Sequence, residues 1–217
     1  MQRLLLSLSL ATSTLARAET PRPPRERDAR FVNAIRNAAE SYQRWGRVDE
    51  RPNLAPALCA AVAAVAAVPS HVRLSQAEDG PHADKLYYLW ASDRGSYLAL
   101  AGEHAKDPPV GLALVKQSFT AKPLATRPEA SAVSESGSVP APVTWLEHDG
   151  KLLAIDRPKD LFVMIKVASG AEPGTDDGWI YGTVAPDGSV TSAGRVERCM
   201  GCHDDAAHGR LFGPRKD

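Results

Sequence analysis

One five-residue run near the C-terminus restricts the fold of this chain more than any other feature: Cys199-Met200-Gly201-Cys202-His203. The pattern C-x-x-C-H is the attachment sequence of a c-type haem. Its thiols add to the vinyl groups along one edge of the porphyrin, and the histidine that follows is carried beneath the iron as a ligand. We therefore expect one covalent haem c, attached through Cys199 and Cys202, with His203 as the iron ligand.

Two other kinds of site compete with haem attachment at this run. One is a zinc site made of Cys199, Cys202 and either His203 or His208, and the other is a redox dithiol. A structural zinc site usually takes four ligands in two spaced pairs, whereas the only other cysteine is Cys59. A thioredoxin-like dithiol belongs early in a βαβ unit rather than near the end of a chain. Covalent haem is therefore the favoured interpretation.

Residues 1–18 have the pattern of a secretory signal peptide. Arg3 gives a positive start, residues 4–10 are apolar apart from two serines, and Ala16-Arg17-Ala18 forms an A-x-A cleavage site. An N-terminal membrane anchor is the alternative, but the apolar run is too short to span a bilayer. We expect cleavage near Ala18 and export to the periplasm, in agreement with haem attachment outside the cytoplasm.

The charge of the chain bears on its partners. It has 26 basic and 26 acidic residues and a formal net charge of zero. A neutral chain without a basic stripe argues against nucleic acid as a partner and gives no sign of a membrane surface. If haem occupies Cys199 and Cys202, Cys59 is left over in an oxidising compartment. A buried thiol is the favoured state of Cys59, and an intermolecular disulfide is the alternative.

The pattern of apolar residues predicts an α+β fold: an antiparallel β-sheet with an N-terminal helix and a C-terminal haem-binding helix. Apolar residues recur every three or four positions from Phe31 to Trp45, after a candidate N-cap at Asp28 and before Gly46. Propensity also favours helix over 54–68. Strands are expected at 86–90, 97–100, 110–115, in a hairpin over 145–155, at 161–167 and at 179–184, with a long loop over 120–142, a tight turn at 186–188 and the haem-binding helix from Arg198.

The position of the haem motif argues against the fold of the small helical cytochromes c. In those proteins the motif opens the domain and a downstream methionine binds the other side of the iron, but no methionine follows His203 here. Several segments instead resemble the cytochrome P-460 family over roughly 84–213. They are DKLYYLWASD (84–93), PVGLALVKQSF (109–119), LFVMIK (161–166), DGWIYGTVAPDG (177–188), SAGRVERCMGCH (192–203) and RLFG (210–213).

The resemblance divides the chain into the signal peptide 1–18, an N-terminal helical segment 19–83 and a cytochrome P-460-like haem c domain 84–217. It implies a fold like that of the β-type cytochromes c′, commonly as a homodimer. In the founding members, a lysine at the end of a strand forms an extra covalent bond to the porphyrin, and Lys116 stands at that motif position. The alternative for Lys116 is a surface lysine or a partner of a haem propionate.

The chain departs from the family at two positions. Catalytic members have a distal carboxylate above the iron where this chain has Phe162, with Met164 beside it. A phenylalanine cannot accept protons from bound hydroxylamine, and it favours neutral ligands such as NO. Glu147 could still reach the site from the hairpin. The family often has Asp where Gly209 stands, so the support from that carboxylate is either missing here or supplied by Asp204 or Asp205.

Three functions are consistent with these residues. The first is a periplasmic monohaem c-type cytochrome that binds and oxidises hydroxylamine or NO at an open distal haem site and passes electrons to a periplasmic redox partner. Lys116 and Phe162 would then be catalytic-site residues. The second is a non-catalytic NO- or gas-binding protein similar to cytochrome c′-β, which Phe162 favours. The third is simple electron transfer, which needs a sixth protein ligand such as Met164.

Overall fold

The computed structural model describes residues 27–54, 85–101, 107–128, 143–148, 150–204, 206 and 208–213. The predicted signal peptide 1–18, nearly all of the helix expected over 54–68, and Cys59 lie outside these residues. Within the described ranges, no helix is long and apolar enough to cross a membrane.

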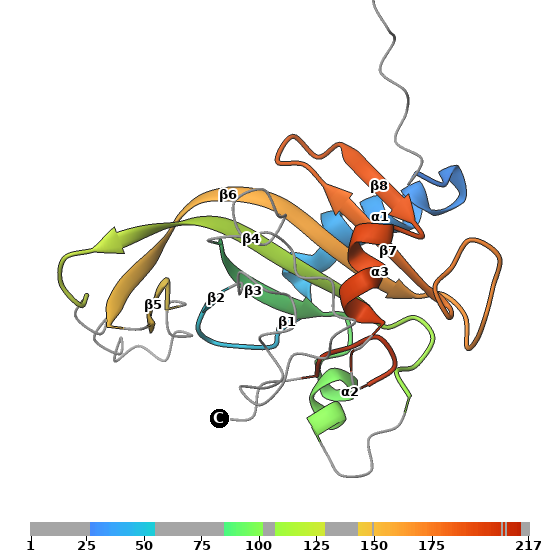
Figure 1. The fold of residues 1–217 in the computed structure, drawn as a ribbon, viewed down its shortest axis with the longest axis horizontal. Helices are drawn as coiled ribbons and strands as arrows, with labels where there is room; N and C mark the ends of the chain where they lie inside the picture. Colours follow the sequence, from blue (N-terminus) through green and yellow to red (C-terminus); the bar gives the residue numbers. More distant parts are fainter. Residues whose placement is uncertain are drawn as a thin grey trace, which may run out of the picture.

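An open eight-stranded sheet of antiparallel pairs forms the body of the described structure (Figure 1), in the order β1-β3-β4-β6-β7-β8, with β2 paired to β3 and β5 to β6. One helix precedes the sheet in the chain and another follows it, which confirms the predicted α+β class. The strands are β1 Gly46–Arg47, β2 Asn53–Leu54, β3 Lys85–Ala91, β4 Ala113–Leu124, β5 Trp145–His148, β6 Lys151–Lys166, β7 Trp179–Val184 and β8 Val190–Gly194; the helices are α1 Ala29–Ser41, η1 Tyr42–Arg44, α2 Arg94–Leu98, η3 Ala99–Ala101 and α3 Glu197–His203.

The N-terminal helix α1 covers one face of the sheet (Figure 1). Asp28 is its N-cap, as predicted, and accepts a hydrogen bond from the backbone N–H of Arg30 at 3.0 Å. Ile35 and Ala38 are buried. Gly182, inside β7, allows the helix to approach this closely, because a Cβ at that position would lie 2.5 Å from the side chain of Ile35.

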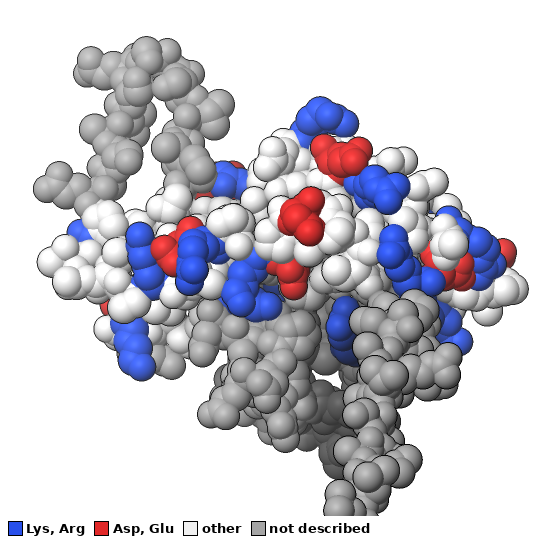
Figure 2. Space-filling model, turned by 90° about the horizontal axis from the view of Figure 1, so that it is seen from above, with Lys and Arg blue, Asp and Glu red and all other residues white. Residues whose placement is uncertain are grey.

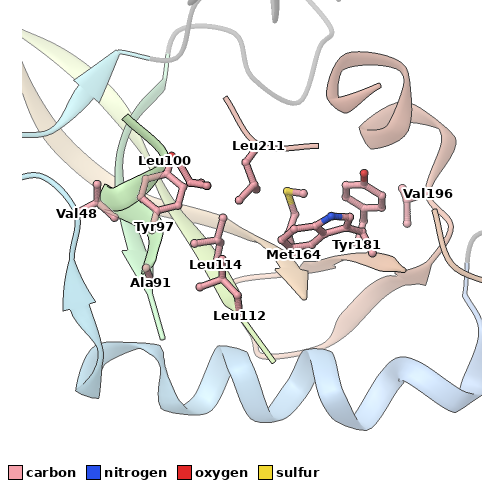
Figure 3. Packing of buried hydrophobic residues seen from close by; sticks show 11 residues of the cluster. Val48, Ala91, Tyr97, Leu100, Leu112, Leu114, Met164, Tyr181, Val196 and Leu211 are labelled. Atoms are coloured by element: carbon pink, nitrogen blue, oxygen red, sulfur yellow. The ribbon is translucent and has the colours of Figure 1, made fainter. Parts of the chain in front are cut away.

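Alternate residues of the central strands face opposite sides of the sheet. Leu114 of β4, Met164 of β6 and Tyr181 of β7 are register partners and share one buried cluster (Figure 3). Val115 and Val163, one position along, belong to a second cluster that includes the buried side of α1. The first cluster packs instead against α3 and the segment that follows it.

The predicted strand at 97–100 is wrong, because the chain forms α2 and the 3₁₀ turn η3 there. Asp93 caps the helix: its carboxylate accepts hydrogen bonds from the backbone N–H of Ser96 at 2.9 Å and from the Ser96 hydroxyl at 2.6 Å. Tyr97 and Leu100 are buried. The apolar run is therefore the inner side of a short helical segment, and a run this short does not distinguish helix from strand.

The lengths of β4 and β6 correct three further predictions. Because β4 continues to Leu124, Lys116 lies within a strand rather than at its end, and the first part of the predicted loop 120–142 is strand. The second strand of the confirmed hairpin and the strand expected at 161–167 are one strand, β6. Backbone pairing between β4 and β6 extends from Ala113 to Leu124. In the outer half of β4, polar residues interrupt the apolar ones, so hydrophobicity did not reveal this part of the strand.

Charged side chains are scattered over the face shown in Figure 2, where Lys and Arg lie among Asp and Glu. On the ribbon formed by β4 and β6, Asp156 lies 4.0 Å from the ammonium of Lys122 and 3.4 Å from Nε of Arg157. Among the described residues of this face, no extended area of one sign is visible.

Candidate functional site

A pocket lies between α3 and the face of the sheet that α1 leaves uncovered. All the residues predicted to form the site line it: Lys116 from β4, Phe162 from β6, and Cys199, Cys202 and His203 from α3. The fold therefore brings together groups that are far apart in the sequence.

The helix α3 sets the spacing of the sulfur and nitrogen atoms. Cys199 precedes Cys202 by three positions and His203 by four, so the three side chains occupy neighbouring positions on one side of the helix. The helix begins after the buried Val196, whose carbonyl oxygen accepts a hydrogen bond from the backbone N–H of Cys199 at 2.9 Å. Both cysteines are partly exposed, so their thiols are accessible for attachment.

The imidazole of His203 is held through one nitrogen. Its Nδ1 lies 2.7 Å from the backbone carbonyl oxygen of Arg210. A carbonyl oxygen only accepts hydrogen bonds, so Nδ1 carries the proton of the neutral ring and Nε2 keeps its lone pair. Burial lowers the pKa of His203 to about 4, which keeps the ring neutral at pH 7. The residue that accepts this hydrogen bond is seven positions away in the sequence, and only the fold identifies it.

Behind this contact lies a buried carboxylate. Asp176 is 5% exposed, accepts a hydrogen bond from Nη2 of Arg210 at 3.0 Å, and accepts another from the hydroxyl of Tyr181 at 2.7 Å. Burial and the hydrogen bond to Asp176 raise the pKa of Tyr181, so its hydroxyl stays protonated. The rings of Tyr181 and Phe212 contact His203, with centroids 5.5 Å and 5.0 Å from the imidazole. The side of the site that holds His203 is therefore closely packed and hydrogen-bonded.

The sheet side of the pocket combines aromatic rings with ammonium groups. Lys116 and Phe162 are register partners. Nζ of Lys116 lies 4.4 Å from the ring centre of Tyr87 and 5.8 Å from that of Phe162, which are cation–π distances. Nζ of Lys85 lies 5.4 Å from the Phe162 ring, and burial lowers the pKa of Lys85. The ring of Phe162 thus has two ammonium groups close to it.

Much of the remaining wall is apolar. Leu114, Met164 and Leu211 line the pocket, and Figure 3 shows Leu211 facing the sheet residues Leu114 and Met164. Tyr97 of α2 donates a hydrogen bond to the carbonyl oxygen of Gly213 at 3.0 Å, which ties the C-terminal segment to the wall. Met164, the methionine named for the electron-transfer alternative, is therefore a pocket residue.

Two polar residues of the pocket were missed by sequence reasoning. Asp49 and Asn53 both line it, and the amide of Asn53 donates a hydrogen bond to Oδ2 of Asp49 at 2.8 Å. Their segment is held to the sheet by a hydrogen bond from the N–H of Val48 to the carbonyl oxygen of Leu89 at 2.8 Å. The sequence carries no local signal for this pair, because a spacing of four residues brings side chains together in a helix and this segment is not helical.

The remaining histidines and several charged residues lie elsewhere or contribute less to the pocket. Glu147 is not among the described lining residues and pairs with Arg127 at 2.5 Å. His148 is exposed at the end of β5, and Arg195 is exposed. Arg198 lines the pocket and lies within hydrogen-bonding distance of the Thr183 hydroxyl, at 3.4 Å. Residues His71, His82 and His104 lie outside the described part.

The groups on the pocket wall fit a c-type haem: two accessible thiols, a neutral imidazole with Nε2 available, and an apolar surface. Among the residues that the structure describes, no three His, Cys, Asp or Glu side chains gather to hold a metal ion by themselves. No protein-family model matches the chain, and no curated protein matches it at a significant level. The resemblance to the cytochrome P-460 family therefore remains a prediction.

Proposed function

We propose that this protein is a periplasmic monohaem c-type cytochrome that binds and oxidises a small nitrogen species, hydroxylamine or NO. The single observation that supports this most is the shared pocket. The thiols of Cys199 and Cys202, His203 with its fixed tautomer, and the wall residues Lys116 and Phe162 all lie around it. A covalent porphyrin would be held by the two thiols and by Nε2 of His203.

The bound haem would supply an iron that exchanges electrons, while the protein controls ligation, polarity and access. The carbonyl oxygen of Arg210 orients His203, and the apolar residues Leu114 and Leu211 exclude water from the pocket. Lys116 lines the pocket, and the family resemblance suggests that its amino group forms a covalent bond to the porphyrin. No residue besides His203 is assigned to the iron, which leaves one face for a small ligand.

Oxidation of hydroxylamine to NO releases electrons and protons in equal number, so both need an acceptor. The electrons would go to a periplasmic redox partner. The carboxylate of Asp49 lies on the pocket wall and can accept protons, with Asn53 holding it in place. Asp49 thus supplies a carboxylate that can accept protons, which the phenyl ring of Phe162 cannot do.

A second function is favoured by the apolar wall. Phe162, Met164 and Leu114 suit a neutral diatomic molecule, so the protein would capture NO without turnover. Simple electron transfer is a third function, with the thioether of Met164 as sixth ligand.

These functions separate when hydroxylamine is added anaerobically to the oxidised protein together with an electron acceptor. Reduction of the acceptor over many turnovers supports the oxidase. A stable change in the visible spectrum without acceptor reduction would show ligand binding alone. A low-spin six-coordinate spectrum before any addition would instead indicate a sixth protein ligand and electron transfer.

The covalent role proposed for Lys116 has its own test. The Lys116→Ala variant should keep both thioether bonds, as seen by mass spectrometry, but change the visible spectrum of the ferrous protein. Lys122→Ala is the matched control, because Lys122 lies on the same strand with a side chain that is 55% exposed. A Lys116→Ala spectrum identical to that of the wild type would rule out the bond.

A further inference from the structure

We infer that Arg210 is a positioning residue for His203: the buried carboxylate of Asp176 holds the Arg210 side chain, and so fixes the backbone carbonyl that orients the imidazole. This inference rests on the proposed function, because the orientation of His203 matters most when Nε2 binds iron.

The argument begins with the backbone of Arg210. His208 and Leu211 exchange two backbone hydrogen bonds, of 3.0 Å and 3.1 Å, and close a tight turn around Gly209 and Arg210. The central residues have φ of 54° and 76°, the signs of a type I′ turn. Glycine, asparagine and aspartate adopt this conformation readily, whereas a side chain such as that of arginine is strained in it. Something outside the turn must favour Arg210 at this position.

Contacts of the side chain supply that support. Nη2 of Arg210 donates a hydrogen bond to Oδ1 of Asp176 at 3.0 Å. Oδ2 of Asp176 accepts a second hydrogen bond, from the Tyr181 hydroxyl, at 2.7 Å. Arg210 also forms an ion pair with Asp204, the residue after His203. The arginine is thus tied to the chain just before β7 and to the end of α3. The first attachment is to Asp176, and the second, to Asp204, directly follows His203 in the chain.

The position of Arg210 determines how His203, the proposed iron ligand, is oriented. The carbonyl oxygen of this strained residue lies 2.7 Å from Nδ1 of His203. A hydrogen bond at Nδ1 selects the tautomer, fixes the rotation of the ring and makes Nε2 a stronger donor to a metal. If the Arg210 side chain is released, the turn is free to relax, and the carbonyl leaves this position.

The test compares Asp176→Asn and Arg210→Ala with the wild type in the haem-loaded protein. Resonance Raman spectroscopy of the ferrous form reports the stretching frequency of the bond between iron and histidine, which falls when the hydrogen bond at Nδ1 weakens. We expect a lower frequency in both variants with thioether attachment unchanged. Glu147→Gln breaks the exposed ion pair with Arg127 and is the matched control, with no expected shift.

If Asp176→Asn does not fold, Arg210→Ala decides the question, because the Arg210 side chain is partly exposed. An unshifted frequency in folded Arg210→Ala would overturn the inference. A second measurement does not need haem: ¹⁵N NMR of the full haem-free chain should show His203 as the Nδ1–H tautomer, and Arg210→Ala should lower that fraction. If the wild-type protein attaches no haem but Arg210→Ala still lowers the Nδ1–H fraction of His203, the proposed function is refuted and the role of Arg210 is supported.

Discussion

The two faces of the central sheet are built from alternate residues of the same strands, yet they serve different ends. On one face, Val115 and Val163 pack with Ile35 of α1, and Gly182 lets the helix reach the strands. On the other face, Lys116 and Phe162 line a pocket that α3 and the C-terminal turn complete. The comparison indicates that the first face is closed by direct packing against α1, whereas the second face combines a buried apolar cluster with a pocket.

The largest expected effect concerns the pocket face. Asp49→Asn should slow acceptor reduction by hydroxylamine about 10²–10⁴-fold, because the loss of a proton acceptor costs about that much. The visible spectrum and the free energy of unfolding should change little. Steady-state kinetics check this result, with Glu50→Gln as control, since Glu50 is the neighbouring exposed acid. Equal rates in Asp49→Asn and the wild type would remove Asp49 from the reaction.

On the opposite face, Ile35→Ala should lower the free energy of unfolding by about 2–5 kcal/mol, the usual cost of truncating a fully buried isoleucine. Haem content and the visible spectrum of the folded variant should stay the same, because Ile35 does not touch the pocket. Chemical denaturation followed by circular dichroism measures the change. A shifted visible spectrum would show that the two faces are not independent.

Close packing at β7 can be tested from the strand side. Gly182→Ala should destabilise the fold by about 1–3 kcal/mol, because the added methyl group would overlap Ile35 and force the helix outward. Gly170→Ala is the control, since nothing lies within 4 Å of a Cβ there and its φ is not positive. The denaturant midpoint of Gly182→Ala should be lower than that of Gly170→Ala. Equal midpoints would mean that α1 is not held tightly against β7.

The smallest effect is expected at the rim of the pocket. Tyr97→Phe removes the hydrogen bond to the carbonyl oxygen of Gly213 and should cost about 0.5–1.5 kcal/mol. Because this bond holds the C-terminal segment, hydrogen exchange should rise locally at residues 208–213 before it rises elsewhere. Unchanged protection of that segment would show that other contacts hold it in place.

Local patterns in the sequence predicted the parts of the fold that depend on local signals. The N-cap at Asp28, the apolar side of α1, the hairpin of β5 and β6, and the strand β7 all follow from neighbouring residues. The strand expected at 97–100 is a helix because the cap at Asp93 outweighs a short apolar run. The outer half of β4 is held by backbone pairing with β6, and its polar side chains give no apolar pattern.

For the candidate site too, the sequence predicted some residues and missed others. C-x-x-C-H identified Cys199, Cys202 and His203, and the resemblance added Lys116 and Phe162, all of which line the pocket. Asp49 and Asn53 were missed, because only the pairing of β1 and β2 with β3 brings their segment to the wall. The link from Asp176 through Arg210 to His203 joins three distant stretches of chain, and a single sequence gives no signal for such contacts.

One measurement tests the covalent attachment of haem most directly. The purified protein is denatured and extracted with acidified acetone, and the pigment is followed between the precipitate and the solvent. We expect the colour to stay with the polypeptide in the wild type and in Cys59→Ser, and to be lost in the double variant Cys199→Ala/Cys202→Ala. A colourless wild-type precipitate, with the pigment in the solvent, would contradict covalent attachment and the function built on it.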